Sequence, residues 1–314
     1  MNNYPAILTE GLTKHYGEVE ALVDLDLEVK RGEVFGFLGP NGAGKTTMIR
    51  TILDLIHPTA GRSSILGLDS HDDAVEIRNH IGYLPSDLSM YPNLTGRDMI
   101  TYFANLRGGV DRQYVDDLAD RLQADLSKKV GDLSSGNRQK VGLILTFMNR
   151  PQVLIMDEPS TGLDPLMQRE FQMMMREVAE EGRTVFLSSH TLSEVQRVAD
   201  RVGIIRTGHL VDVEFVDDLR SKAIRTVELQ FDGPVEASVF ESVPGVRDVE
   251  VASHHATMSF DGQMDTLLRT AAEHYTLVDV NTQEADLEEI FLEYYRDGKG
   301  ADSSPRPSRE GTSV

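Results

Sequence analysis

The chain has 314 residues, 40 % of them hydrophobic, which is enough for one large domain and a small one. Its 31 basic and 51 acidic residues give a net charge of −20, which argues against general nucleic-acid binding because that needs basic surface. The absence of cysteine excludes disulfides and cysteine-bound metals. The acidic, lysine-poor composition suits either an ordinary acidic cytosolic protein or a salt-rich cytoplasm.

Neither a signal peptide nor a membrane span is predicted. The first residues lack a basic start followed by an apolar run. No stretch approaches the roughly 20 apolar residues that a spanning helix needs. We therefore expect a protein that is soluble alone, although it could sit on a membrane partner.

The first two thirds of the chain alternate between strand and helix patterns. Buried strands are predicted at 33–38, 152–159 and 184–189, and helices at 45–56, 165–181 and 192–200. This alternation predicts an α/β core with a parallel sheet. Residues 86–150 show helical patterns without a strong strand, so we expect a helical insertion there.

The pattern changes near residue 216. Short strands at 226–231, 247–251, 257–260 and 277–280 are interleaved with helices at 236–242, 264–274 and 286–296. This β-α-β-β-α-β-α order is compatible with a small ferredoxin-like α+β sandwich. We expect a main domain over 1–215, an acidic accessory domain over 216–297, and a disordered tail over 298–314, which is rich in Gly, Ser and Pro.

A glycine-rich stretch joins the first predicted strand and helix. Gly39 to Thr46 has the spacing G-x-x-x-x-G-K-T. Its glycines let backbone amides close on phosphate oxygens, and the helix start directs free amides at the anion. The Lys45 ammonium can reach β- and γ-phosphates, and the Thr46 hydroxyl can bind Mg²⁺. The stretch therefore predicts a phosphate-binding loop rather than a chance glycine-rich turn.

Two carboxylates follow the second strand. Residues 153–156 are apolar and lead into Asp157 and Glu158, which should face the ligand crevice at the carboxyl end of a parallel strand. Asp157 suits water-mediated binding of Mg²⁺, and Glu158 suits polarising an attacking water. The pair favours hydrolysis over transfer to a bound acceptor, although a solvated acidic turn is the simpler alternative.

These segments resemble the nucleotide-binding subunit of ABC transporters, in particular the separate ATPase subunits of ABC-2-type exporters. The resemblance covers about residues 5–215. It is carried by GPNGAGKTT (Walker A), VLIMDEP (Walker B), LSSGNRQ (signature loop), STGLD (D-loop), LSSH (switch histidine) and HYG (adenine-stacking aromatic). It implies a P-loop NTPase, RecA-like core with antiparallel β and helical subdomains, followed by the small C-terminal α+β domain.

The resemblance also implies roles for single residues. Tyr16 would stack on adenine, unless it is a core tyrosine, and Glu158, His190 and Lys45 would be catalytic. His190 would contact the γ-phosphate and hold the attacking water, unless it is structural. The residues expected to bind ATP in the loop are Gly39, Pro40, Asn41, Gly42, Ala43, Gly44, Lys45, Thr46 and Thr47.

In this family the signature loop completes the site of a second copy. Ser134 and Gly136 would contact the γ-phosphate bound by the other chain of a head-to-tail homodimer, and Asp164 would couple the two sites. The implied partner is an integral-membrane permease. The implied location is cytoplasmic, at the inner face of the membrane.

Two positions depart from the family pattern. The signature reads LSSGN where the family has LSGGQ, so Ser135 replaces a glycine and Asn137 a glutamine, and we expect slower turnover. Ser86 stands at the position of the Q-loop glutamine, which binds Mg²⁺ and relays to the permease. A serine is too short for both roles, so either water could bridge from Ser86, which stays a candidate metal ligand, or coupling could rely on Tyr83, Asp87 and Tyr91.

Other functions are weaker interpretations. A soluble ABC-type ATPase acting on nucleic acid or ribosomes is disfavoured by the single cassette, the lack of a coiled-coil insertion and the acidic charge. A P-loop kinase or GTPase leaves LSSGN and His190 without a role. The C-terminal domain could sense a ligand, strengthen the dimer or restrain the permease, and the transported substrate is not encoded in these residues.

Overall fold

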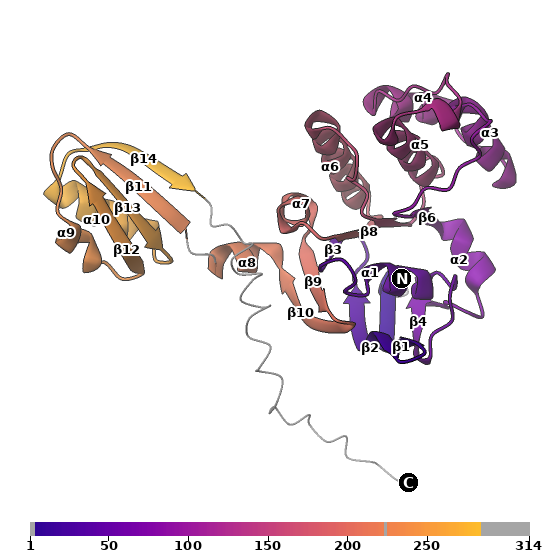
Figure 1. Ribbon diagram of the computed structural model, residues 1–314, viewed down its shortest axis with the longest axis horizontal. Helices are drawn as coiled ribbons and strands as arrows, with labels where there is room; N and C mark the ends of the chain where they lie inside the picture. Colours follow the sequence, from indigo (N-terminus) through magenta and orange to yellow (C-terminus); the bar gives the residue numbers. More distant parts are fainter. Residues whose placement is uncertain (1–3, 223–224, 284–314) are drawn as a thin grey trace, which may run out of the picture. The chain divides into compact units, whose positions relative to one another are not determined.

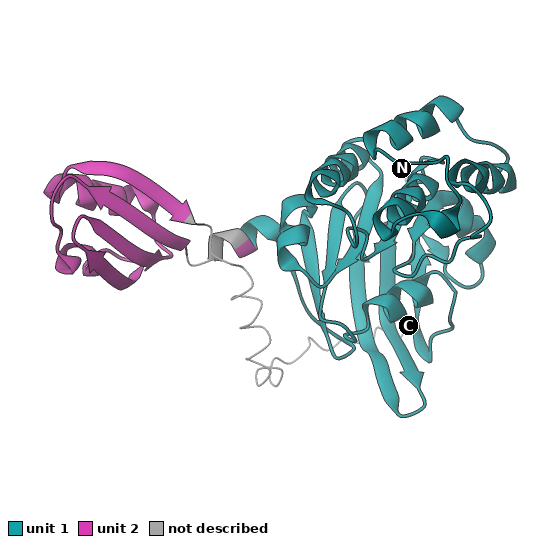
Figure 2. Ribbon diagram, turned by 45° about the horizontal axis from the view of Figure 1, so that its top comes forward, with its two compact units in different colours: residues 1–218 teal, residues 219–314 magenta. Residues whose placement is uncertain are grey.

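The chain divides into two compact units, Met1–Asp218 and Leu219–Val314 (Figure 2). The computed structural model describes residues 4–222 and 225–283. The helix predicted at 286–296 and the tail predicted at 298–314 lie outside these described residues.

A six-stranded sheet forms the centre of the first unit, in the order β10-β9-β3-β8-β7-β6. Its strands are β3 (Val34–Leu38), β6 (Ile81–Leu84), β7 (Val153–Asp157), β8 (Thr184–Ser189), β9 (Arg201–Arg206) and β10 (His209–Phe215). All pairs are parallel except the edge pair of β9 and β10. Every residue of β3, β7 and β8 is buried, as expected for parallel strands covered on both faces. The predicted α/β core is confirmed.

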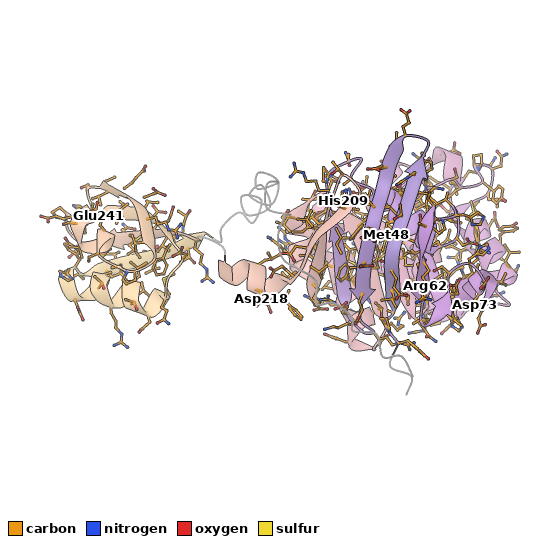
Figure 3. All side chains as sticks on the ribbon, turned by 90° about the horizontal axis from the view of Figure 1, so that it is seen from below. Met48, Arg62, Asp73, His209, Asp218 and Glu241 are labelled. Atoms are coloured by element: carbon orange, nitrogen blue, oxygen red, sulfur yellow. The ribbon has the colours of Figure 1, made fainter. Side chains whose placement is uncertain are left out.

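A second, antiparallel sheet lies beside the central helix α1 (Lys45–Ile52). Its order is β2-β1-β4-β5. The strands are β1 (Ile7–Tyr16), β2 (Val19–Val29), β4 (Ala60–Ile65) and β5 (Leu68–Asp69). One buried cluster joins Leu12 of this sheet and Phe37 of the central sheet with Met48 and Ile49 of α1. Figure 3 labels Met48 within this unit. The helix is therefore held by apolar contacts with both sheets.

The prediction of a helix over 45–56 was too long. Helix α1 ends at Ile52, and Asp54 takes a left-handed conformation with φ 52°. The Leu55 amide then turns back to donate to the Arg50 carbonyl at 2.9 Å. Apolar periodicity continues through this turn because Leu53 still packs into the core, so the pattern alone could not locate the end.

The predicted helical insertion is present between β6 and β7, where α3, α4 and α5 are grouped together (Figure 1). The other helices of the first unit are α2 (Ala74–His80), α3 (Gly96–Leu106), α4 (Arg112–Arg121), α5 (Ser135–Phe147), α6 (Pro165–Glu180) and α7 (Leu192–Val198), with a 3₁₀ turn, η1, at Val130–Asp132. Helix α8 (Val216–Lys222) follows β10 and spans the boundary between the two units. Side chains start several of them: Thr95 and Asp98 form a capping box on α3, and Ser134 caps α5. These caps fix where each helix begins.

The second unit has the predicted β-α-β-β-α-β order. Its elements are β11 (Arg225–Phe231), α9 (Ala237–Glu241), β12 (Val246–Ala252), β13 (His255–Phe260), α10 (Met264–His274) and β14 (Leu277–Gln283). The strands form one antiparallel sheet in the order β12-β13-β11-β14, the ferredoxin-like arrangement. A core of its own includes Phe231, Phe240 and Phe260, all almost fully buried.

None of the helices in the described ranges 4–222 and 225–283 combines the length and apolar character needed to cross a bilayer.

Candidate active site

The phosphate-binding loop runs from the end of β3 to the start of α1, as the spacing predicts. Two glycines are needed for its path. A side chain on Gly39 would place its Cβ 2.5 Å from the Ile205 carbonyl oxygen. Gly44, the residue before α1, has φ 112°, a conformation that only glycine adopts without strain. The loop is thus packed closely against the sheet while the first amides of α1 remain available to an anion.

The Lys45 side chain is buried within the loop, with 6 % of its surface exposed. Its ammonium donates to the carbonyls of Gly39 at 2.6 Å and Pro40 at 3.2 Å. It also lies 3.3 Å from Oε1 of Glu158. These contacts hold the cation at the loop, where it can bind phosphate oxygens.

Asp157 ends β7 and is completely buried. Its Oδ2 accepts from the Thr46 hydroxyl at 2.7 Å, and its Oδ1 accepts from the Ser188 hydroxyl. Burial raises the pKa of the neighbouring Tyr83 phenol, and the negative charge of Asp157 adds to that rise. Thr46 and Asp157, predicted to hold a metal together, are therefore in direct contact.

Glu158 lies one residue beyond β7 in a left-handed conformation, with φ 52°. Such a conformation is costly for a residue with a side chain and clusters at functional sites. Its Oε2 lies 2.8 Å from Nδ1 of His190, which follows β8. Its buried Oε1 has no hydrogen-bond partner among the described residues, because Lys45 is close but not aligned with it. The charge that this oxygen faces is therefore the Lys45 ammonium, 3.3 Å away.

A cavity of about 330 Å³ lies over the loop. Its walls include the predicted residues Pro40, Asn41, Gly42, Gly44, Lys45, Thr46, Thr47, Ser86 and Glu158. Ser86 therefore lies at the site even though it is not a glutamine. The β2 residues Val19, Glu20 and Ala21 also form the wall, and sequence reasoning missed them because they belong to no motif.

Tyr16 ends β1 opposite Val19, and 49 % of its surface is exposed. The Lys14 ammonium lies 5.1 Å from the centre of its ring. Tyr16 is not part of the cavity wall, so the structure brings its neighbour Val19, but not Tyr16 itself, to the phosphate site. It is an exposed residue rather than a core tyrosine.

The signature loop lies at the start of α5. Ser134 is exposed, and its Oγ accepts from the Asn137 amide at 3.2 Å. A Cβ on Gly136 would lie 2.6 Å from the carbonyl oxygen of Gly162 in the D-loop. The D-loop ends at Asp164, which caps α6 by accepting from the Leu166 and Met167 amides. None of Ser134, Gly136 and Asp164 forms the wall of the cavity over the phosphate loop of its own chain.

Asn137, the departure from the family glutamine, has a structural role that the sequence did not reveal. Its Oδ1 accepts from the Asp125 amide and its Nδ2 donates to the Asp125 carbonyl, both at 2.8 Å. The next glutamine along the helix, Gln139, donates to the Pro159 carbonyl at 2.7 Å. The signature helix is thus tied both to the segment that follows α4 within the helical insertion and to the segment after Glu158.

The arrangement can bind a polyphosphate and activate water. The start of α1 and the Lys45 ammonium attract the anion. Glu158 and His190 form a hydrogen-bonded carboxylate–imidazole pair beside it, suited to orienting and deprotonating a nucleophile. This chemistry matches hydrolysis of a phosphoanhydride.

Comparisons with known proteins agree with the geometry. The family model described as "ABC transporter" matches residues 22–161. The chain is 33 % identical to the bacitracin transport ATP-binding protein BcrA of Enterococcus faecalis, over 91 % of this chain and 94 % of that protein. It is 36 % identical to the daunorubicin resistance ATP-binding protein DrrA3 of Streptomyces coeruleorubidus, over 69 % of this chain and 70 % of that protein.

A solved structure described as an ATP binding subunit of an ABC transporter is also similar. It has a TM-score of 0.63 and 30 % identity, covering 68 % of this chain and 92 % of that chain. The fold is therefore that of the P-loop ATPase cassette. With a relative above 30 % identity across nearly its whole length, the chain belongs to the ABC transporter family as an ATP-binding, ATP-hydrolysing subunit.

Proposed function

We propose that this chain is the motor subunit of an ABC-2-type exporter, acting as a head-to-tail dimer on a separate membrane permease. The observation that carries the proposal is the alignment with a bacitracin transport ATP-binding protein over 91 % of the chain. This share exceeds the first unit, Met1–Asp218, so the similarity continues into the second unit. Similarity that includes the second unit therefore supports a separate ATPase subunit of an exporter, rather than an ABC ATPase of unspecified type.

The residues around the phosphate loop fit Mg²⁺ as the cofactor of ATP. Thr46 and Asp157 present a hydroxyl and a carboxylate oxygen 2.7 Å apart, which is the hard-oxygen donor set that Mg²⁺ prefers. Ser86 is a further candidate because it forms part of the same cavity wall. Bound Mg²⁺ would neutralise charge on the β- and γ-phosphates.

The chain's own residues would carry out hydrolysis as follows. Lys45 exchanges its carbonyl contacts for phosphate oxygens. Glu158 accepts a proton from water as the water oxygen bonds to the γ-phosphorus and the bond to the ADP oxygen breaks, and it then releases this proton to solvent. His190 holds Glu158 in place and contacts the γ-phosphate. Tyr16 would stack on adenine from the exposed hairpin end, with Val19 beside it.

A second copy would complete each site. Ser134 is exposed at the start of α5, and together with the amide of Gly136 it would contact the γ-phosphate held by the other chain. Asp164 would lie at the same junction. Hydrolysis removes the γ-phosphate contact, so the dimer opens and moves the permease bound at the cytoplasmic face of the membrane.

The test is co-purification with the membrane protein encoded beside this gene, followed by transport assays in proteoliposomes. We expect a complex with two copies of this chain, and ATP-dependent transport of drug-like or peptide-antibiotic substrates. Lys45→Ala in the same complex is the control, because it should leave assembly intact and abolish transport. Co-sedimentation with ribosomes in place of the membrane protein, with ATPase activity stimulated by ribosomes, would contradict the proposal.

A further inference from the structure

At the opposite end of α1 from the phosphate loop, three metal-ligating side chains converge. Nδ1 of His57 and Nδ1 of His71 each lie 3.1 Å from the same oxygen, Oδ1 of Asp54. The two imidazole rings meet edge to face, with centroids 5.0 Å apart. Each residue offers a ligand atom within 4.8 Å of the other two.

Contacts independent of any ligand set the positions of Asp54 and His71. Asp54 is fixed by the turn that ends α1, and only 14 % of its side chain is exposed. His71 lies in a short turn in which Asp69 Oδ1 accepts from the amides of His71 and Asp72. The Ser70 amide donates to the Ser63 carbonyl of β4 at 3.0 Å. Because the backbone is already ordered, binding would require little rearrangement.

The donor atoms suit a divalent transition metal. Four-coordinate zinc, with bonds of about 2.0–2.2 Å, separates neighbouring nitrogen and oxygen ligands by roughly 3.3–3.5 Å. The two nitrogen–oxygen separations of 3.1 Å need to lengthen only slightly to reach that range. Two imidazoles favour zinc, nickel or copper over Mg²⁺ or Ca²⁺, which prefer oxygen.

Ser70 supplies a second, independent observation. Its hydroxyl is buried without a hydrogen-bond partner among the described residues, and 6 % of the residue is exposed. Ser70 borders the same cavity, of about 330 Å³, as Asp54, His57 and His71. A rotation of the Ser70 side chain toward the cavity would let this hydroxyl bond to a water on the open coordination position of a metal.

The surrounding charges and exposure are compatible with a cation. Arg62, labelled in Figure 3 with Asp73, also borders the cavity, but its Nε donates to Glu10 at 2.6 Å. Asp69 adds a carboxylate to the wall. His57 and His71 have side-chain exposures of 72 % and 66 %, so solvent ions reach them. Simple surface ion pairs would explain the histidine contacts, but they leave the Ser70 hydroxyl unexplained.

We propose that Asp54, His57 and His71 form a binding site for one divalent transition-metal ion of the zinc type. The ion would link the end of α1 to the connection before β4 and to the turn before α2. It would stabilise the first unit independently of nucleotide chemistry at Lys45 and Glu158, because none of its ligands forms the wall of the nucleotide cavity.

The test is titration of the tag-free full chain, stripped with chelator, with ZnCl₂ in buffer containing excess Mg²⁺. We expect one Zn²⁺ per chain by calorimetry and a melting temperature raised by about 5 °C or more at a 100-fold excess over the dissociation constant. His71→Ala and His57→Ala should each weaken binding at least about tenfold. The exposed His209 (Figure 3) gives the matched control, His209→Ala, which should bind as the wild type does.

Circular dichroism of the zinc-free variants checks that they fold as the wild type does. No saturable binding to the wild type would overturn the proposal. Equal zinc affinity in the wild type and in a His57→Ala/His71→Ala double variant would also overturn it, since the ion would then be held elsewhere.

Discussion

The phosphate-loop region and the signature loop both resemble motifs of the same family, but the two regions differ in burial and in their contacts. Around the phosphate loop, Lys45 and Asp157 are buried, and their polar atoms contact residues of the same chain. At the signature loop, Ser134 is exposed, and contacts within the chain fix the backbone around it. The phosphate-loop region is thus buried and bonded within its own chain, whereas the signature loop is an exposed surface whose backbone is held by contacts within the chain.

This difference has a mechanistic meaning. A group that must bind phosphate within its own chain benefits from preorganisation by internal hydrogen bonds. A group that must contact a nucleotide in another chain has to be exposed before the two chains meet. Substitutions around the phosphate loop should therefore lower nucleotide binding or hydrolysis by the chain that carries them. Substitutions at the signature loop should lower turnover only when two chains have assembled.

The largest effect is expected for Glu158→Gln. The substitution preserves the size of the side chain and its place beside His190, but removes the base, so turnover should fall by about 10²–10⁴-fold. Steady-state ATPase assays, with nucleotide affinity measured in parallel, separate chemistry from binding. Turnover within a few-fold of wild type would remove Glu158 from the reaction.

Lys45→Ala should lower turnover by about 10²–10³-fold, the usual effect of losing one charge-stabilising donor. Unlike Glu158→Gln, it should also weaken ATP binding in the isolated chain, because the ammonium contacts phosphate in the ground state. Fluorescent-nucleotide titration measures this loss. Unchanged affinity would show that the loop amides alone hold the nucleotide.

Gly136→Ala tests the second region. The new Cβ would lie 2.6 Å from the Gly162 carbonyl, so the signature loop must shift away from the D-loop. We expect turnover to fall by at least about tenfold, while ATP affinity of the isolated chain is unchanged. Gly233→Ala, at a glycine with open space around it, is the matched control. A loss of affinity in the isolated chain would break the distinction between the two regions.

Asn137→Ala should act on stability rather than on nucleotide binding. It removes both hydrogen bonds to the Asp125 backbone, which should cost about 1–3 kcal/mol of unfolding free energy. Thermal melting of the zinc-free chain, compared with Asn105→Ala at an exposed position, measures the change. Equal melting temperatures for the two variants would show that these bonds add nothing to stability.

The smallest effect is expected for Ser86→Ala. This hydroxyl borders the cavity but is exposed, and one neutral hydrogen bond changes a rate by at most about tenfold. The measurement is turnover as a function of Mg²⁺ concentration. A loss comparable to that of Glu158→Gln would place Ser86 among the essential groups despite its short side chain.

The sequence predicted those parts of the molecule that depend on local spacing. The phosphate loop, the carboxylates after a buried strand and the β-α-β-β-α-β order of the second unit each follow from neighbours in the chain. Contacts between distant segments were not predictable. Gly136 against Gly162 and Asn137 against Asp125 depend on how α5 packs, and no pattern within one segment encodes this.

The cluster of Asp54, His57 and His71 was missed for a related reason. Only two of the three residues are close in sequence, and the third arrives on the turn after β5. The cluster also depends on the early end of α1, which apolar periodicity did not reveal. A continued helix would have carried Asp54 and His57 on a different path.

The most direct test is the mass of Glu158→Gln by analytical ultracentrifugation with Mg·ATP, with Mg·ADP and without nucleotide. The buried phosphate-loop region and the exposed signature loop together predict that Glu158→Gln is a dimer with Mg·ATP and a monomer with Mg·ADP or without nucleotide. The double variant Glu158→Gln/Gly136→Ala should remain a monomer with Mg·ATP. The contradicting result is a Glu158→Gln chain that binds Mg·ATP but stays monomeric, both free and on its permease. Two chains would then not share a nucleotide site.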